Sequence, residues 1–206
     1  MKLVLIGGGG HARVVAEVAT AAGHELLGVL TPCEASPAEG LTRLGDDRWI
    51  EHARAETGFH IAFGPRHDSN DREAAFSRLA ALRLAMPALV SPAAQVSQLA
   101  EIGDGTLVVH GAIVNAGATL GVNVIVNSGA IVEHDCAVGR HSHVAPGAIL
   151  AGSVQTGERC LIGAGAVILP GLTIADRTVI GAGAVVAKSI ADPDTTWSGN
   201  PARRHR

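Results

Sequence analysis

The second half of the chain carries an apolar residue at every sixth position without interruption. Counting by six from Val90 to Val186 gives seventeen positions, and sixteen of them are Val, Ile or Leu, with Thr156 as the exception. The fourth residue after each position is mostly small, as at Ala112 and Cys136. Such a period is typical of hexapeptide repeats, in which three short parallel strands form one coil of a triangular prism. Seventeen hexads predict a parallel β-helix of between five and six coils.

The narrow interior of such a prism explains why the chain has few aromatic residues. A ring would force neighbouring coils apart, and the hexads contain none of the five aromatic residues, which are Trp49, Phe59, Phe63, Phe76 and Trp197. Sixteen of the 26 glycines follow Leu89, where repeated corners need positive φ. We therefore predict a first domain at 1–88, the repeat domain at 89–191 and a C-terminal tail at 192–206.

The first domain alternates apolar strands with helical patterns. We predict strands at 2–6, Glu25–Leu30 and Phe59–Phe63, and helices directly after the glycine cluster, at Asp46–Thr57 and at Asn70–Leu84. Leu79, Leu82 and Met86 are expected on the apolar side of the last helix. This alternation predicts a small Rossmann-like α/β domain with a parallel sheet.

The glycine cluster suggests a phosphate-binding loop. Its pattern, Gly7-x-Gly9-x-x-Ala12, approximates the dinucleotide fingerprint, in which a helix N-terminus binds phosphate oxygens. The acidic residue that would bind a ribose about twenty positions later is missing, since the second strand ends at Thr31-Pro32 and Glu34 is only nearby. A nicotinamide cofactor is therefore disfavoured. Gly64-Pro65, after the third strand, either lies beside this loop or is a simple turn.

Composition excludes several classes of partner. A net charge of -3 and a pI of 6.3 provide no basic field for nucleic acid. The apolar stretches are too short and too often interrupted by Gly for a membrane span, and Met1-Lys2 leads into the glycine cluster without a signal-peptide pattern. We expect a cytoplasmic protein with neither a nucleic-acid nor a membrane partner.

The three cysteines do not suggest chemistry. An odd number without framework spacing argues against a disulfide scaffold. Cys136 and Cys160 occupy inward repeat positions and are expected to be core residues, while Cys33 lies in a loop that contains Pro. The basic residues at 200–206 and Lys188 are expected to be solvated.

A histidine followed by a carboxylate is the best candidate for catalysis. Val132 and Cys136 take the inward positions of their hexad, so His134 and Asp135 lie at a corner and point outward. A carboxylate can hold one imidazole nitrogen and leave the other free to accept a proton. The alternative is a pair of solvated corner residues. Gly152, one coil later at the same corner, removes side-chain bulk beside the imidazole and leaves room for a ligand.

A second histidine suggests that the site is shared between subunits. His143 follows His134 by nine residues, which is one and a half faces of the prism, so the two lie on different sides of one chain. They could meet where the corner of one prism packs against the face of another. We therefore predict a homotrimer with three intersubunit sites.

Five segments together resemble a known family. They are VLIGGGGHARVV, the short α/β region, LVSPAAQVS, NSGAIVEHDCAVGRHSHVAPGAILAG and SGNPAR. The chain resembles the sugar acyltransferases that include sialic acid O-acetyltransferase and the nucleotide-amino-sugar N-acetyltransferases of bacillosamine and perosamine synthesis. The resemblance implies that the β-helix is left-handed, that acetyl-CoA is the co-substrate and that no metal is required.

The resemblance also implies roles for individual residues. His134 would take the proton from the acceptor, and Asp135 would raise its basicity. The residues expected near acetyl-CoA are His143 at the thioester, with Gly152, Ala164 and Ala182 along a groove between adjacent prisms. Those expected to hold the uridine or guanosine nucleotide of the sugar are Gly9, Gly10, His11 and Gly64. Relatives commonly carry acidic residues where this chain has Thr31-Pro32.

We thus expect N-acetylation of a UDP- or GDP-linked 4-amino-deoxyhexose by direct transfer. One alternative is O-acetylation of sialic acid or a related sugar. Two others are a zinc-dependent lyase that uses His110, His134, His141 and His143 across a trimer, and a scaffold without catalysis. The sequence leaves open the sugar, the ring position, the nucleoside base and the pathway.

Overall fold

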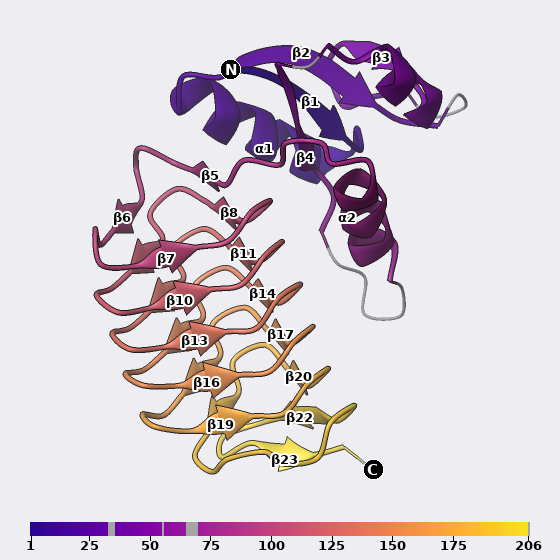
Figure 1. Cartoon of the computed structure of the whole chain (residues 1–206). Helices are drawn as coiled ribbons and strands as arrows, with labels where there is room; N and C mark the ends of the chain where they lie inside the picture. Colours follow the sequence, from indigo (N-terminus) through magenta and orange to yellow (C-terminus); the bar gives the residue numbers. More distant parts are fainter. Residues whose placement is uncertain (33–35, 55, 65–69, 206) are drawn as a thin grey trace. The chain divides into compact units, whose positions relative to one another are not determined.

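The structure, a computed structural model, describes residues 1–32, 36–54, 56–64 and 70–205 (Figure 1). Cys33, Glu34 and Pro65, to which the sequence analysis refers, lie outside the described residues. The chain divides into two compact units, Met1–Pro92 (unit 1) and Ala93–Arg206 (unit 2). The domain boundaries at 88/89 and 191/192 stay predictions.

Unit 1 contains a four-stranded parallel sheet of strand order β3-β2-β1-β4. Its elements are β1 (Lys2–Ile6), α1 (Gly10–Ala21), β2 (Glu25–Leu30), β3 (Arg43–Gly45), the 3-10 helix η1 (Asp47–His52), β4 (Thr57–Ile61), α2 (Asp71–Ala81) and β5 (Leu89–Val90). The core includes Val4, Phe59 and Leu79. The predicted parallel α/β sheet and the strand at Glu25–Leu30 are confirmed.

Two strand predictions in unit 1 need correction. The strand predicted at Phe59–Phe63 begins two residues earlier, because β4 pairs with β1 in a register that sets Lys2 opposite Thr57 and Ile6 opposite Ile61. The short strand β3 was not predicted. It pairs with the end of β2, so its existence depends on a partner distant in sequence.

Two helix predictions in unit 1 are too long. Instead of a helix at Asp46–Thr57, Asp46 caps the single 3-10 helix η1, and the chain becomes extended at Ala53 before it pairs as β4. The helix predicted at Asn70–Leu84 ends at Ala81, and Leu82 is 53% exposed rather than packed. Leu79 is buried as predicted, while Met86 is buried beyond the helix.

Unit 2 is a parallel β-helix of two-residue strands (Figure 1). Each strand from β6 to β18 pairs with the strand eighteen residues later, as Ile131 does with Ile149, which stacks the coils in three sheets. The first sheet holds β6 (Gln95–Val96), β9 (Ile113–Val114), β12 (Ile131–Val132), β15 (Ile149–Leu150), β18 (Val167–Ile168) and β21 (Val185–Val186). The second holds β7 (Glu101–Ile102), β10 (Thr119–Leu120), β13 (Ala137–Val138), β16 (Gln155–Thr156) and β19 (Thr173–Ile174). The third holds β8 (Leu107–Val108), β11 (Ile125–Val126), β14 (His143–Val144), β17 (Leu161–Ile162) and β20 (Val179–Ile180), followed by β22 (Thr196–Ser198) and the antiparallel β23 (Arg203–Arg204).

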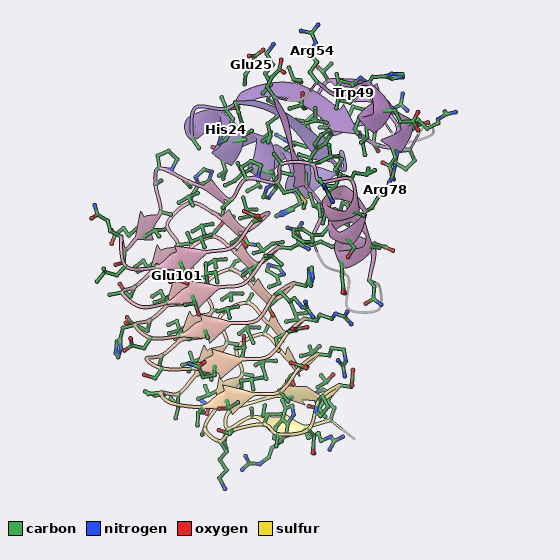
Figure 2. All side chains as sticks on the ribbon, viewed as in Figure 1. His24, Glu25, Trp49, Arg54, Arg78 and Glu101 are labelled. Atoms are coloured by element: carbon green, nitrogen blue, oxygen red, sulfur yellow. The ribbon has the colours of Figure 1, made fainter. Side chains whose placement is uncertain are left out.

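The predicted apolar ladder forms the interior of unit 2. From Val108 to Val186, every sixth residue is at most 7% exposed, and Thr156 has that highest value. The second series of positions, each four residues after a ladder position, is also buried from Thr106 to Ala184, except that Leu172 is half-buried. Charged side chains stand outside the coils, as Glu101 does on β7 (Figure 2). The hexapeptide prism predicted from the sequence is confirmed.

Among the described residues, no helix is long and apolar enough to cross a bilayer. The cytoplasmic location stays a prediction.

Candidate active site

The His134–Asp135 pair lies at the corner between β12 and β13, as predicted. The backbone of this corner is held from both sides, because Asp135 donates its N–H to the Ala116 carbonyl in the preceding coil, and the His134 carbonyl accepts from Ser153 in the following one. The two side chains point away from the core and are 60% and 67% exposed. A rigid backbone thus presents an accessible imidazole to solvent.

The carboxylate of Asp135 sets the chemistry of the imidazole. Nδ1 of His134 lies 2.9 Å from Oδ2 of Asp135. An ionised carboxylate only accepts, so Nδ1 carries the proton and Nε2 keeps its lone pair. The hydrogen bond with Asp135 raises the pKa of His134 above its ordinary value, and the charges of Asp135 and Glu133 act in the same direction. This is the arrangement of a general base.

Two glycines lie against this pair, and only one was predicted. A Cβ at Gly152 would lie 2.6 Å from Nε2 of His134, so the space left by this glycine is occupied by the imidazole itself and not left for a ligand. Gly117 lies one coil before Asp135, and a Cβ at Gly117 would lie 2.6 Å from Oδ1 of Asp135. The eighteen-residue register that singled out Gly152 could also have found Gly117.

His143 lies on a different side of the prism from His134. It begins β14 in the third sheet, whereas the His134 corner joins the first and second sheets. Its Nε2 is 3.1 Å from Nδ2 of Asn127, which donates to it, and sequence reasoning did not identify this partner. The structure therefore does not bring the two histidines together within one chain.

The other residues expected to bind acetyl-CoA also fall on two corners. Ala164 and Ala182 are exposed in consecutive turns of the corner that follows the third sheet, and Gly183 donates its N–H to the carbonyl of Ala164. Gly152 lies on the corner of His134. One chain thus presents His143, Ala164 and Ala182 from one region and His134 with Gly152 from another.

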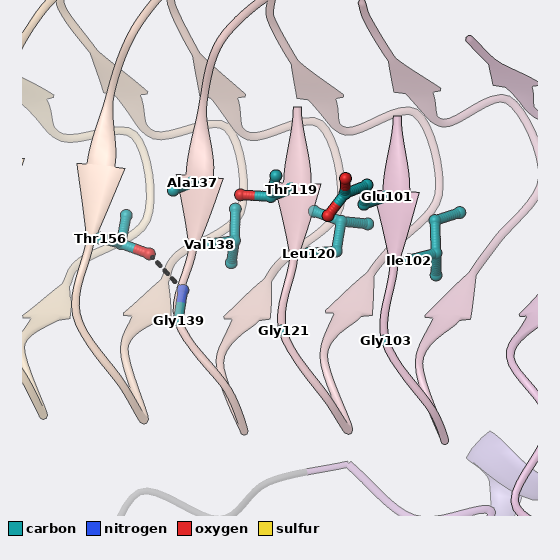
Figure 3. A pocket seen from close by; sticks show the side chains of 10 residues that line it. All are labelled: Glu101, Ile102, Gly103, Thr119, Leu120, Gly121, Ala137, Val138, Gly139 and Thr156. Atoms are coloured by element: carbon teal, nitrogen blue, oxygen red, sulfur yellow. Dashed lines mark hydrogen bonds between the residues drawn. The ribbon is translucent and has the colours of Figure 1, made fainter. Parts of the chain in front are cut away.

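An open groove lies on the second sheet, over β7, β10 and β13 (Figure 3). It has a volume of about 440 Å³. Its lining residues are Glu101, Ile102, Gly103, Thr119, Leu120, Gly121, Ala137, Val138, Gly139 and Thr156. The stacked glycines and small side chains leave a shallow surface that is open to a large ligand or to another protein chain.

The predicted nucleotide-binding residues of unit 1 lie at the carboxyl end of the sheet. Gly9 is the N-cap of α1 and Gly10 is its first residue, and a Cβ at either glycine would meet no described atom within 4 Å. Gly64 follows β4 and is equally open. The neighbouring Phe63 lies against Gly7, where a Cβ would be 2.8 Å from its ring, so the glycine loop and the segment after β4 are adjacent.

Unit 1 also buries basic side chains that sequence reasoning missed. Arg72 is 5% exposed and donates to the carbonyls of Ile61 and Phe63, while its Nε and Nη2 have no hydrogen-bond partner among the described residues. Burial lowers its pKa to about 9. Burial, followed by the charge of Arg72, lowers the pKa of His11 to about 4 and that of His60 to about 3. His11 is thus neutral at pH 7.

The described cysteines do not form a nucleophilic site. Cys136 and Cys160 are free and buried, as predicted for core residues. Burial raises the pKa of both thiols, that of Cys160 to about 11. Within the described ranges, no group of three or more His, Cys, Asp or Glu side chains could hold a metal ion.

Comparisons with known proteins agree with this architecture. The family model for the PglD N-terminal domain matches residues 2–79, and that for the bacterial transferase hexapeptide (six repeats) matches residues 153–188. No curated protein sequence matches the chain. The predicted fold class, an α/β domain followed by a left-handed parallel β-helix, is confirmed.

Several solved structures are similar over the whole chain. The acetyltransferase domain of PglB from Neisseria gonorrhoeae FA1090 is 36% identical, with a TM-score of 0.92 and 99% of each chain covered. The same domain in complex with acetyl coenzyme A is 35% identical, with a TM-score of 0.92, and the match covers 99% of this chain and 98% of that one. PerB from Caulobacter crescentus in complex with CoA and GDP-perosamine is 33% identical, with a TM-score of 0.91, covering 100% of this chain and 98% of that one.

Proposed function

The chain belongs to the acetyl-CoA-dependent sugar acetyltransferases of the bacillosamine and perosamine type, and on that premise we propose that it acetylates the amine of a UDP- or GDP-linked 4-amino-deoxyhexose. The observation that carries this proposal is the similarity, over the full chain, to PerB from Caulobacter crescentus in complex with CoA and GDP-perosamine. Thr31-Pro32 departs from the acidic residues common in the family, so uridine and guanosine acceptors are both tested below.

His134 is the proposed general base. Nε2 takes a proton from the acceptor amine as its nitrogen bonds to the thioester carbonyl carbon, while Asp135 stabilises the imidazolium through Nδ1–H. The tetrahedral oxyanion collapses with cleavage of the C–S bond, and the imidazolium returns the proton to the thiolate of CoA. The acetyl group passes directly from the thioester to the amine, and no group on the protein is acetylated.

A second copy of the chain is needed to complete the proposed site. His143, Ala164 and Ala182 lie away from the His134 corner in one chain, so a neighbouring subunit would supply them to the thioester and the pantetheine. We propose a homotrimer with three such sites. Sedimentation should give a trimer, and a fully active monomer would exclude the shared site.

Unit 1 is the proposed binding region for the nucleotide. Backbone groups at Gly9 and Gly10 face open space at the start of α1, where amide N–H groups favour phosphate oxygens. His11 and Gly64 border the same loop, and buried Arg72 adds positive charge nearby.

The proposal is tested by an acceptor screen with acetyl-CoA and detection of released thiol. A UDP-linked or a GDP-linked amino sugar should be acetylated, whereas sialic acid and other hydroxyl acceptors should not. Turnover of hydroxyl acceptors alone would instead assign the O-acetyltransferase function. Turnover of neither class would contradict the transferase assignment.

Replacement of the base gives a second test. His134→Ala should lower kcat by about two to four orders of magnitude, the usual contribution of a general base. Gln98→Ala, an exposed residue at the same corner position two coils earlier, is the matched control and should have near-normal turnover. Near-normal turnover in His134→Ala would refute the assignment.

A further inference from the structure

The orientation of the candidate catalytic pair needs an explanation beyond its single hydrogen bond. Both side chains are more than half exposed, and an exposed ion pair contributes little to conformational order by itself. The remaining neighbours are the stacked turns of the same corner, which contain Ala116-Gly117 in the coil before the pair and Gly152-Ser153 in the coil after it.

Each side chain of the pair lies against a glycine of an adjacent coil. A Cβ at Gly117 would lie 2.6 Å from Oδ1 and 3.6 Å from Cγ of Asp135. A Cβ at Gly152 would lie 2.6 Å from Nε2 and 2.7 Å from Cε1 of His134. Separations below 3.0 Å essentially never occur around a real Cβ, so any other residue would displace the carboxylate or the imidazole.

Backbone conformation does not account for these glycines. Gly117 has φ +73°, but Asp135 and Ser153 adopt φ +60° at the equivalent position of the same corner without being glycine. Gly152 has no positive φ. The other two positions that flank the pair, Ala116 and Ser153, both carry a side chain. Of these four flanking positions, glycine occupies the two at which a Cβ would meet the pair.

We propose that Gly117 and Gly152 are positioning residues, which hold the Asp135 carboxylate and the His134 imidazole in hydrogen-bonded alignment by leaving the adjacent coil surface free of a Cβ. This inference rests on the proposed role of His134 as base. Gly117 acts through Asp135, and Gly152 acts directly on the ring whose Nε2 would face the acceptor.

The test compares Gly117→Ala with Gly129→Ala. Both glycines lie in β-helix turns, at φ +73° and +65°, so both substitutions impose the same left-handed strain, but a Cβ at Gly129 meets nothing within 4 Å. Gly117→Ala should lower kcat roughly ten- to hundredfold, because small misplacements of catalytic groups have effects of this size. Gly129→Ala should keep near-normal kcat. Equal losses in the two variants would overturn the proposal.

Two further measurements separate positioning from general damage. In a His134→Ala background, Gly117→Ala and Gly152→Ala should cause no additional loss of kcat, because they act through the same group. A full additional loss would identify a merely structural role and overturn the proposal.

The second measurement is the NMR titration of the His134 imidazole without substrates. The groups that raise its pKa are Asp135 and Glu133, and Gly117→Ala should lower that pKa toward the ordinary value while Gly129→Ala leaves it unchanged. This readout does not depend on turnover. If Gly117→Ala shifts the pKa of His134 but leaves kcat unchanged, Gly117 does align the pair, but His134 is not the base. If the pKa of His134 does not change, Gly117 does not align the pair.

Discussion

Two groups of glycines, one in each unit, have different surroundings. In unit 2, a Cβ at Gly139 would lie 2.2 Å from the carbonyl oxygen of Gly157, and Gly103 and Gly121 are similarly crowded by the next coil. In unit 1, a Cβ at Gly9 or Gly10 would meet no described atom within 4 Å, and neither residue has positive φ.

The two groups of glycines therefore need different explanations. The crowded glycines of unit 2 are explained within the chain, since the coils could not stack at their present spacing around a side chain. Nothing in the described part of unit 1 requires glycine at 9 or 10, and an alanine would favour the helix. The nucleotide proposed to bind there would account for these glycines, because bare backbone can approach a ligand closely.

The largest effect should come from adding a methyl group between coils. Gly139→Ala forces a Cβ onto the backbone of Gly157, and we expect it to lower the free energy of unfolding by about 3 kcal/mol, the upper end of the usual cost of overpacking. Denaturant unfolding measures this loss. The control, Gly165→Ala, has φ +65° and open space, and should lose only about 1–2 kcal/mol. Equal losses would show that coil stacking does not explain the glycines of unit 2.

Acid should affect unit 1 before unit 2. His60 is fully buried with a pKa of about 3, whereas the unfolded chain titrates near 6.5. The unfolded state therefore binds a proton below pH 6.5 that the folded state excludes. The free energy of unfolding should fall by about 2 kcal/mol between neutral pH and pH 5.

This effect is measured by amide hydrogen exchange at neutral pH and at pH 5, with the protection of β1 and β4 compared with that of the coils of unit 2. His60→Asn should remove the pH dependence assigned to this residue, while His205→Asn, which is exposed, should not. Equal acid sensitivity in both units would contradict the role assigned to the buried imidazole of His60.

A smaller effect on stability should accompany a loss of binding at the glycine loop. Gly10→Ala should increase the free energy of unfolding by about 0.5–1 kcal/mol, because alanine loses less conformational entropy in a helix. The added methyl group faces the proposed phosphate position, so calorimetry should show weaker binding of UDP or GDP. Gly23→Ala, at φ +83° after α1, should destabilise the unit without affecting binding. Unchanged nucleotide affinity in Gly10→Ala would place the ligand elsewhere.

The smallest effect on stability should come from the residue with the largest effect on turnover. His134 is 60% exposed and lies outside the prism interior, so His134→Ala should change the free energy of unfolding by less than about 0.5 kcal/mol. Thermal unfolding at fixed pH measures this change. A large loss of stability would mean that the pair supports the coil stacking as well as the chemistry.

Sequence reasoning was most successful where contacts repeat. The positions of His134, Asp135 and Gly152 at one corner followed from counting by six and by eighteen, and Gly117 was missed only because the count was not applied in the preceding direction. Arg72 and His60 carried no sequence signal, since a basic residue in a helix or a histidine in a strand is ordinarily exposed or incidental. Only packing revealed that both are buried, each with a side-chain nitrogen that has no hydrogen-bond partner in the described part of the chain.

The sequence by itself determined the prism, because each residue of a repeat contacts the residue one coil away and a single period describes the whole interior. Only the tertiary structure decided the start of β4, the exposure of Leu82 and the burial of Arg72. Each depends on packing that no period specifies: pairing with β1 for the strand, the end of α2 for Leu82, and the carbonyls of Ile61 and Phe63 for Arg72.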